Sequence, residues 1–174
     1  MEEVIVLRYG HRIVRDYRVT THCGLVARAF GAKRIIIQGA EDESIIDGIS
    51  RIRDKWGGKF AVEFVDSWRK VVKKYQKQGY LAVHATMYGE PLQKKIGKIR
   101  GNKVLLILGS QKVVKEVYEL ADFNISVTTQ PHSEIAALAV FLHEYFQGNE
   151  LELKFKGAKV EIVPEKKGKR VIKS

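Results

Sequence analysis

The chain has 174 residues, with 31 Lys and Arg against 20 Asp and Glu, a formal net charge of +11. Hydrophobic residues make up 45% of it, which excludes a disordered or collagen-like chain, and its apolar runs are too short to span a membrane. The single cysteine, Cys23, excludes an internal disulfide and a cysteine-based zinc cluster. No signal segment opens the chain, so we expect a soluble cytoplasmic protein.

Short, nearly continuous apolar runs alternate with helical patterns along the chain. Such runs are typical of strands that are buried on both faces of a parallel sheet. Their alternation with helices predicts an α/β fold. The predicted strands are residues 4–7, 34–38, 60–65, 80–85, 103–108 and 123–127.

The segments between these strands have apolar residues at helical spacing. The first helix is expected to begin after Thr20–Thr21 and to end at Gly31, a plausible pair of caps. The last helix is the most apolar, so we expect it to be the most buried. The predicted helices are residues 22–30, 42–56, 66–79, 111–121 and 133–146.

The C-terminal part has a different pattern. Residues 151–155 and 159–164 alternate apolar and polar side chains around a Lys-Gly-Ala turn, which predicts a small β-hairpin. The polar and basic tail, 165–174, is expected to be mobile. We therefore predict a main unit of residues 1–150 and an extension of the same domain, 151–174, made of the hairpin and the tail.

The positive charge is distributed unevenly. Residues 69–103 hold ten basic side chains against Glu90 alone, and 151–174 have a net charge of +5, whereas 104–150 have −4. Neutralising phosphates releases condensed counterions, so this distribution favours a nucleic-acid partner. Solvated lysine faces on helices are the alternative for any single cluster.

Three loops follow predicted strands at the edge where open α/β sheets bind ligands. They are 85–91, Gly109-Ser110 and 128–133, and the last two are expected to open helices whose backbone N–H groups face a ligand. Ordinary turns and helix caps are the alternative. The chain has no dinucleotide fingerprint, P-loop or metal-binding motif, which disfavours NAD enzymes, P-loop NTPases and a metal site.

Arginine recurs in the segment before the first predicted helix. Arg12, Arg15 and Arg18 are spaced every third residue, and a guanidinium donates forked hydrogen bonds to phosphate. Tyr17 lies between them and can stack on a base. The alternative is a solvated loop in which Asp16 pairs locally.

Longer stretches of the chain resemble the archaeal SPOUT-class tRNA 2′-O-methyltransferases, which methylate the ribose of the T-loop cytidine at tRNA position 56. The resemblance implies a trefoil knot in the C-terminal part of the parallel sheet, S-adenosylmethionine as the cofactor, and a homodimer in which helix 133–146 takes part. The matching stretches are Arg15-Asp16-x-Arg18-Val19-Thr20-Thr21-His22, continuing to Ala27-Arg28-Ala29-Phe30-Gly31-Ala32; Thr86-Met87-Tyr88-Gly89; and Thr129-Gln130-Pro131-His132-Ser133-Glu134.

The resemblance also implies which residues form the site. Backbone groups of the three loops are expected to hold the cofactor, and basic side chains to bind RNA. The implied cofactor residues are Ala85, Gly109, Ser110, Gln111, Lys112, Val113, Ile125, Val127, Thr128, Thr129, Gln130, Pro131, His132 and Ser133, and the RNA-binding candidates are Arg12, Lys73, Lys77, Lys94 and Lys95.

The catalytic residues are less directly implied. Related enzymes have a catalytic arginine at a spacing that falls here on Leu25, so the nearest candidates are Arg18 and then Arg15. Arg18 is expected to grip the phosphate beside the target ribose. A guanidinium stays protonated, so the general base is open between His22 and His132.

Two other functions are compatible with these residues. One is a SPOUT methyltransferase that modifies an RNA base. The other is a non-catalytic RNA-binding domain, which explains the charge but leaves the 86–89 and 129–134 loops without a purpose.

Overall fold

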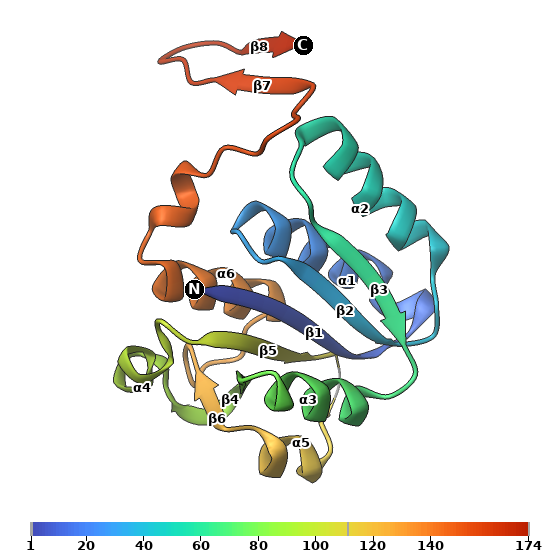
Figure 1. Ribbon diagram of the computed structural model, residues 1–174, viewed down its shortest axis with the longest axis vertical. Helices are drawn as coiled ribbons and strands as arrows, with labels where there is room; N and C mark the ends of the chain where they lie inside the picture. The colour runs from blue at the N-terminus through green and yellow to red at the C-terminus, as the bar shows by residue number, and fades with distance from the viewer. Residues whose placement is uncertain (1, 111, 174) are drawn as a thin grey trace.

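The six predicted strands form one parallel sheet, in the order β3-β2-β1-β5-β4-β6 (Figure 1). The computed structural model describes residues 2–110 and 112–173. The α/β fold class is confirmed. The strands are β1 (Glu3–His11), β2 (Arg34–Gly39), β3 (Ala61–Val65), β4 (Tyr80–Pro91), β5 (Lys103–Gly109) and β6 (Phe123–Ser126).

Helices cover both faces of the sheet, and three of them, α2, α3 and α6, match the prediction closely. All three are capped by side chains, because Asp42 accepts a hydrogen bond from the Ser44 N–H, Ser67 from the Lys70 N–H and Ser133 from the Ala136 N–H. The helices are α1 (Ile13–Ala29), α2 (Glu43–Trp56), α3 (Trp68–Lys77), α4 (Leu92–Ile99), α5 (Lys115–Leu120) and α6 (Glu134–Phe146), followed by a 3-10 helix, η1 (Asn149–Glu152).

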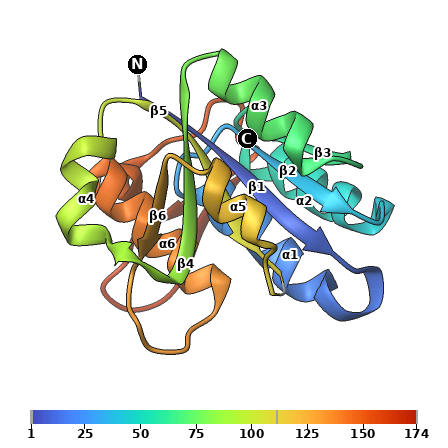
Figure 2. The same cartoon turned by 90° about the horizontal axis from the view of Figure 1, so that it is seen from below.

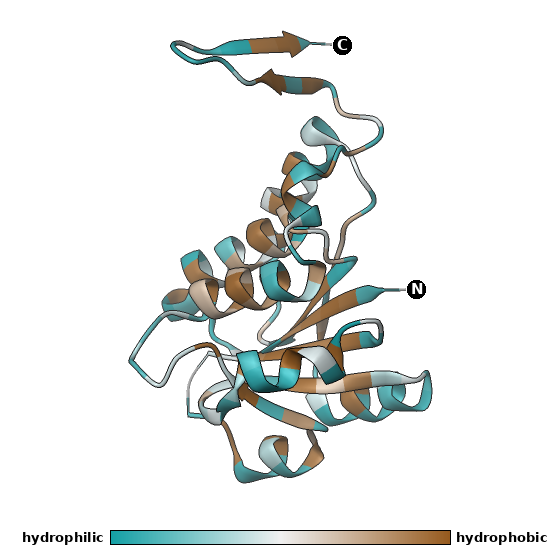
Figure 3. Cartoon of the chain, turned by 90° about the vertical axis from the view of Figure 1, so that its left-hand side faces the viewer, coloured by the Kyte–Doolittle hydropathy of each residue, from teal (hydrophilic) through white to brown (hydrophobic). Residues whose placement is uncertain are grey.

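Side-chain alternation in the central strand divides the core into two layers. Val4 and Val6 of β1 pack with buried residues of α1, α2, α4 and α6, and Ile5 and Leu7 pack with those of α3 and α5. Figure 3 shows the apolar strands between the helical layers. The predicted burial of the last helix is confirmed, since Leu138, Phe141 and Leu142 are fully buried.

The prediction that the first helix begins after Thr20–Thr21 is wrong. The helix α1 begins at Ile13, where the Asp16 carboxylate accepts hydrogen bonds from the Arg12 backbone N–H at 3.0 Å and from Arg12 Nε at 2.8 Å. Thr20 is buried and its hydroxyl lies 2.9 Å from His11 Nδ1. The arginine-rich segment is therefore mostly helix rather than loop.

The segments on either side of β5 also differ from the prediction. Gly109-Ser110 does not open a helix directly, because α5 begins only at Lys115. The helix α4 was not predicted; Leu92, Ile96 and Ile99 bury its inner face, and lysines occupy much of the rest. It starts directly after Pro91, and its eight residues are too few for a clear helical period.

Strand β4 pairs with β6 twice. Ile125 of β6 pairs with Ala85 and also with Glu90, both in parallel. The two partners of one strand residue lie on opposite edges, so the end of β4 occupies the outer edge of β6. The crossing depends on Gly89, where a Cβ atom would lie 2.5 Å from the Ile125 backbone N. This arrangement agrees with the trefoil knot, which stays a prediction.

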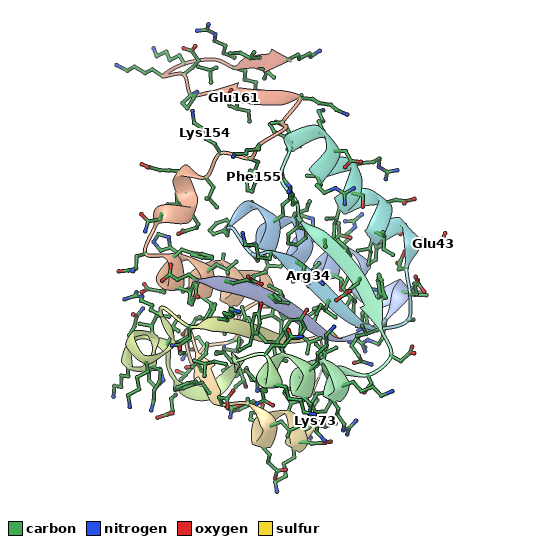
Figure 4. The ribbon with its side chains drawn as sticks, in the orientation of Figure 1. Arg34, Glu43, Lys73, Lys154, Phe155 and Glu161 are labelled. Atoms are coloured by element: carbon green, nitrogen blue, oxygen red, sulfur yellow. The ribbon has the colours of Figure 1, made fainter. Side chains whose placement is uncertain are left out.

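A C-terminal hairpin is present, but the predicted pairing of 151–155 with 159–164 is wrong. The strand β7 (Val160–Val163) pairs with β8 (Arg170–Lys173), which comes from the tail that was expected to be mobile. Residues before it pack on the body instead: the Arg28 guanidinium lies 4.5 Å from the Phe155 ring centroid, and the Gly58 N–H donates to the Lys156 carbonyl at 2.9 Å. The hairpin stands apart from the sheet (Figure 1). Phe155 lies on the segment that connects the two and points toward the body of the protein (Figure 4).

Candidate functional site

A cavity of about 750 Å³ opens at the carboxyl ends of β4 and β5. This is the sheet edge at which open α/β folds bind ligands, and the volume is typical of a small-molecule site. Strand ends, the segment before α5, α5 itself and the first turn of α6 supply its lining residues. Figure 2 shows the arrangement of these elements from below. The lining residues are 84–88, 108–110, 112, 113, 115, 118, 132, 134 and 137.

One wall is an ordered polar network around Tyr118. The His84 Nδ1 atom lies 2.9 Å from Asn124 Oδ1, the Asn124 amide donates to the Tyr118 carbonyl at 2.9 Å, and the Tyr118 hydroxyl lies 3.1 Å from Thr86 Oγ1. The His84 and Tyr118 rings meet edge to face at 4.7 Å. Burial lowers the pKa of His84, so this wall is neutral at pH 7.

The turn after β5 is held tightly to β1. The Ser110 N–H donates to the Tyr9 carbonyl at 2.9 Å, and the Ser110 hydroxyl donates to the Gly10 carbonyl. The Gly109 carbonyl accepts a hydrogen bond from Arg8 Nη1 at 2.6 Å. The backbone on this side of the cavity is therefore fixed before any ligand binds.

A buried ion pair connects this turn to α6. Arg8 is fully buried, and its Nη1 and Nη2 atoms each lie 3.3 Å from Glu134 Oε1. Sequence reasoning missed both residues. The available signal was Arg8 itself, a charged residue that directly follows the apolar run of the first predicted strand.

The loop between β6 and α6 is largely exposed, and it reaches the cavity at His132. His132 Nδ1 lies 2.7 Å from the Gln130 carbonyl, which only accepts, so Nδ1 carries a proton. The Gln130 N–H donates to Thr128 Oγ1 at 3.2 Å, which stabilises the turn.

The cavity brings together six of the fourteen residues expected to hold the cofactor, and seven of the other described positions take no part in its lining. Ile125 is buried in the core, the residues 127–131 and Ser133 lie outside the lining, and Gln111 lies outside the described residues. The six lining residues are Ala85, Gly109, Ser110, Lys112, Val113 and His132.

The three catalytic candidates lie outside the cavity lining, on one exposed stripe of α1. Arg15, Arg18 and His22 follow one another at helical spacing, and all three are exposed. Within residues 2–110 and 112–173, none of their side chains forms a hydrogen bond or an ion pair, so these side chains are available to a partner. The helix α1 begins at the carboxyl end of β1, which is the same sheet edge that carries the cavity.

The RNA-binding candidates do not form a single cluster. Lys73 and Lys77 lie on the exposed side of α3 (Figure 4 labels Lys73), whereas Lys94 and Lys95 belong to α4. Lys95 pairs with Glu90 at 2.7 Å, and Arg12 is occupied by Asp16.

The described part of the chain holds neither a metal cluster nor a membrane-spanning helix. It contains no group of three or more His, Cys, Asp or Glu side chains placed to hold a metal ion. None of its helices has the length and apolarity needed to cross a membrane.

The fold is that of the SpoU-type methyltransferases of known structure. An Aquifex aeolicus TrmH/SpoU tRNA modifying enzyme matches 86% of this chain and 75% of its own, with a TM-score of 0.61 and 15% identity. The SpoU methyltransferase AviRb from Streptomyces viridochromogenes, solved in complex with AdoMet, matches 83% of this chain and 56% of its own, with a TM-score of 0.60 and 16% identity.

Sequence comparison places the chain within that class. A family model described as "tRNA ribose 2'-O-methyltransferase, aTrm56" matches residues 56–172. The tRNA (cytidine(56)-2'-O)-methyltransferases of Methanopyrus kandleri and Pyrococcus horikoshii are each 48% identical to this chain, over 96% and 97% of it and 94% and 84% of their own lengths. The chain belongs to the family of tRNA ribose 2′-O-methyltransferases.

Proposed function

We propose that the protein transfers a methyl group from S-adenosylmethionine to the ribose 2′-hydroxyl of cytidine 56 in tRNA. The near-full-length similarity to tRNA (cytidine(56)-2'-O)-methyltransferases carries the choice of reaction and nucleotide. The cavity at the carboxyl ends of β4 and β5 supplies a site for the methyl donor. The net charge of +11 suits a polyanionic substrate.

The residues of the cavity fit S-adenosylmethionine. The donor combines an uncharged adenosine part with a methionine part that carries charges of both signs. The cavity offers a neutral wall around His84 and Tyr118, and also two lysines and the carboxylate of Glu134. Ala85, Gly109, Ser110 and Val113 would hold its nucleoside part through backbone and apolar contacts. When bound, the cofactor supplies a methyl group that is activated by a positively charged sulfur.

The chain's own contribution to the reaction is to position the RNA and to accept a proton. The free guanidinium of Arg18, with Arg15 beside it on α1, is suited to grip the phosphate next to the target ribose. His22 on α1 and His132 at the cavity are the two candidates to accept the 2′-hydroxyl proton. Nδ1 of His132 is occupied by the Gln130 carbonyl, so its Nε2 atom is the one available.

A homodimer belongs to this proposal. Helices α1 and α6 pack against each other, and both expose apolar side chains: Ile13 is 48% exposed and Val14 97% on α1, and Val140 is 41% exposed on α6. An interface there would cover these side chains and bring the α1 arginines of one protomer near its partner.

We assign three further properties to the protein in the same proposal. The double pairing of Ile125 and the close approach at Gly89 support a trefoil knot around β6. The extension 151–174 is part of the same domain, anchored through Phe155 and the Gly58–Lys156 hydrogen bond. A substrate such as tRNA places the enzyme in the cytoplasm, with Arg12, Lys73, Lys77, Lys94 and Lys95 on the surfaces that contact RNA.

The test uses unmodified tRNA transcript, methyl-labelled S-adenosylmethionine and the purified protein, followed by nucleoside analysis. Label in 2′-O-methylcytidine that disappears when cytidine 56 is replaced is the expected result. Label in a methylated base would refute ribose methylation. Tight tRNA binding without cofactor binding would leave an RNA-binding domain and refute the enzyme.

A further inference from the structure

The cavity contains one negatively charged side chain among its described lining residues. That residue is Glu134, at the start of α6, and its side chain is 32% exposed. The positive charges, Lys112 and Lys115, come from a different part of the lining, in and before α5. Charged groups of both signs therefore line the cavity, a carboxylate from α6 and two ammonium groups from in and before α5.

A buried arginine holds the carboxylate in place. The Arg8 side chain is 1% exposed, and both of its terminal nitrogens contact the same oxygen, Glu134 Oε1, at 3.3 Å. Arg8 Nη1 also donates to the Gly109 carbonyl at 2.6 Å, which ties the pair to the end of β5. The other carboxylate oxygen, Oε2, has no hydrogen bond within the described residues.

Stability alone does not explain this pair. Removing the Arg8 charge from water is costly, and its partner Glu134 stays 32% exposed, so the pair stabilises the fold little better than apolar side chains of the same size would. Here the Arg8 Nε atom is also buried without a hydrogen-bond partner. An arrangement of this kind is more readily explained by a ligand that needs the carboxylate at the cavity wall.

We infer that the Arg8–Glu134 pair is the element of the cavity that recognises the positively charged sulfonium of S-adenosylmethionine and discriminates against the neutral thioether of the product, S-adenosylhomocysteine. Glu134 makes the contact, and Arg8 is a positioning residue that acts through it. This inference rests on the proposed function. It predicts that loss of the methyl group weakens binding and so favours release of the spent cofactor.

The two lysines in and before α5 determine which of the cofactor's two positive charges lies near Glu134. In the cofactor, the α-ammonium and α-carboxylate are attached to the same carbon atom, whereas the sulfonium is three bonds away. Lys112 and Lys115 are the groups that suit the α-carboxylate, so the ammonium lies on their side of the cavity. The sulfonium is then the cation that remains for the α6 side.

The test measures binding by titration calorimetry, without RNA, for three ligands. These are S-adenosylmethionine, S-adenosylhomocysteine, and sinefungin, which has a protonated amine in place of the sulfonium. The variants are Glu134→Gln, which removes the charge at constant size, and Glu134→Asp, which keeps it. Glu144→Gln is the matched control, because Glu144 lies on the same helix, is 28% exposed, and pairs with Arg100 at 3.1 Å.

We expect Glu134→Gln to weaken binding of S-adenosylmethionine and sinefungin about tenfold, a fraction of the Coulomb energy of two charges in contact at a partly solvated site. Binding of S-adenosylhomocysteine should change by less than about twofold, since it has no charge at that position. Glu134→Asp should retain most of the preference, and Glu144→Gln all of it. The ratio of two affinities is internal to each variant, so a fraction of unfolded protein does not alter it.

An equal loss for all three ligands would overturn the inference and assign Glu134 to the α-ammonium. Unchanged affinities for all three ligands in Glu134→Gln would refute any role of its charge. Failure of the wild-type protein to bind any of the three would refute the proposed function itself, and the inference with it.

Discussion

Replacing Gly89 with alanine tests the crossing of β4 over β6. An added Cβ atom would lie 2.5 Å from Ile125 N, 2.6 Å from Asn124 C and 2.6 Å from Ile125 C, whereas ordinary contact begins at 3.4 Å. The shortfall is 3.4 − 2.5 = 0.9 Å, and all three atoms are backbone, so no side-chain rotation relieves it. Overpacking of this kind destabilises a fold by about 1–3 kcal/mol, and we expect about 2–3 kcal/mol here.

The assay is urea unfolding, with thermal unfolding as a second measurement. A loss of 2–3 kcal/mol should lower the Tm by about 4–12 °C for a domain of this size. Cofactor binding should also weaken, because residues 86–88 line the cavity directly before Gly89. Gly97→Ala is the control: Gly97 is exposed in α4 with no neighbour within 4 Å of its Cβ position, so this change should stabilise by about 0.5–1 kcal/mol. If the free energy of unfolding of Gly89→Ala is within about 0.5 kcal/mol of the wild-type value, the backbones of β4 and β6 are not as close at the crossing as the structure has them.

Three other predictions follow from local contacts. The Arg12 hydrogen bond lowers the pKa of Asp16, so the Asp16 carboxylate contributes its full stability above the ordinary carboxyl pKa and loses it as the pH falls below about 4. The difference in unfolding free energy between wild type and Asp16→Asn, measured by urea unfolding from pH 7 to pH 2, should therefore narrow below that pH and not above it. Burial raises the pKa of Cys23 to about 11, so iodoacetamide at pH 8 should label the native protein far more slowly than the unfolded one, and equal rates by mass spectrometry would contradict this. Phe155→Ala should lower stability by about 1–2 kcal/mol, less than for a fully buried phenylalanine, because the ring is only partly buried under Arg28; an unchanged urea midpoint would mean that Phe155 does not anchor the extension.

The sheet was predictable from the sequence because its strands are buried on both faces. Runs such as VLLIL of β5 are continuously apolar because both faces of the strand are buried. Each strand and its place in the α/β alternation could therefore be predicted. The start of α1 was not predictable in the same way. Its cap is a contact between Arg12 and Asp16, and a dense run of charges gives no apolar period to indicate a helix.

Contacts between distant segments decided the features that sequence reasoning missed. Residues 151–155 alternate like a strand, but Phe155 contacts Arg28, and the chain then turns away to pair β7 with the tail.

The candidate site has both predictable and unpredictable residues. Loop positions such as Ala85 and Gly109 follow from the ends of strands, whereas the pairing of Arg8 with Glu134 joins residues 126 positions apart and has no local signature.

The double pairing of β6 has a consequence for self-association. An open sheet normally has two exposed edges, and each can recruit a strand from another molecule and begin aggregation. In the described part of this sheet, β4 fills both edges of β6, which leaves β3 as the free edge. That strand is only five residues long and carries Glu63 at its centre, paired with Arg34, and a short strand with a charge is a common defence against strand addition. The wrapping of one strand around another thus covers one of the two sheet edges at which a strand of another molecule could add.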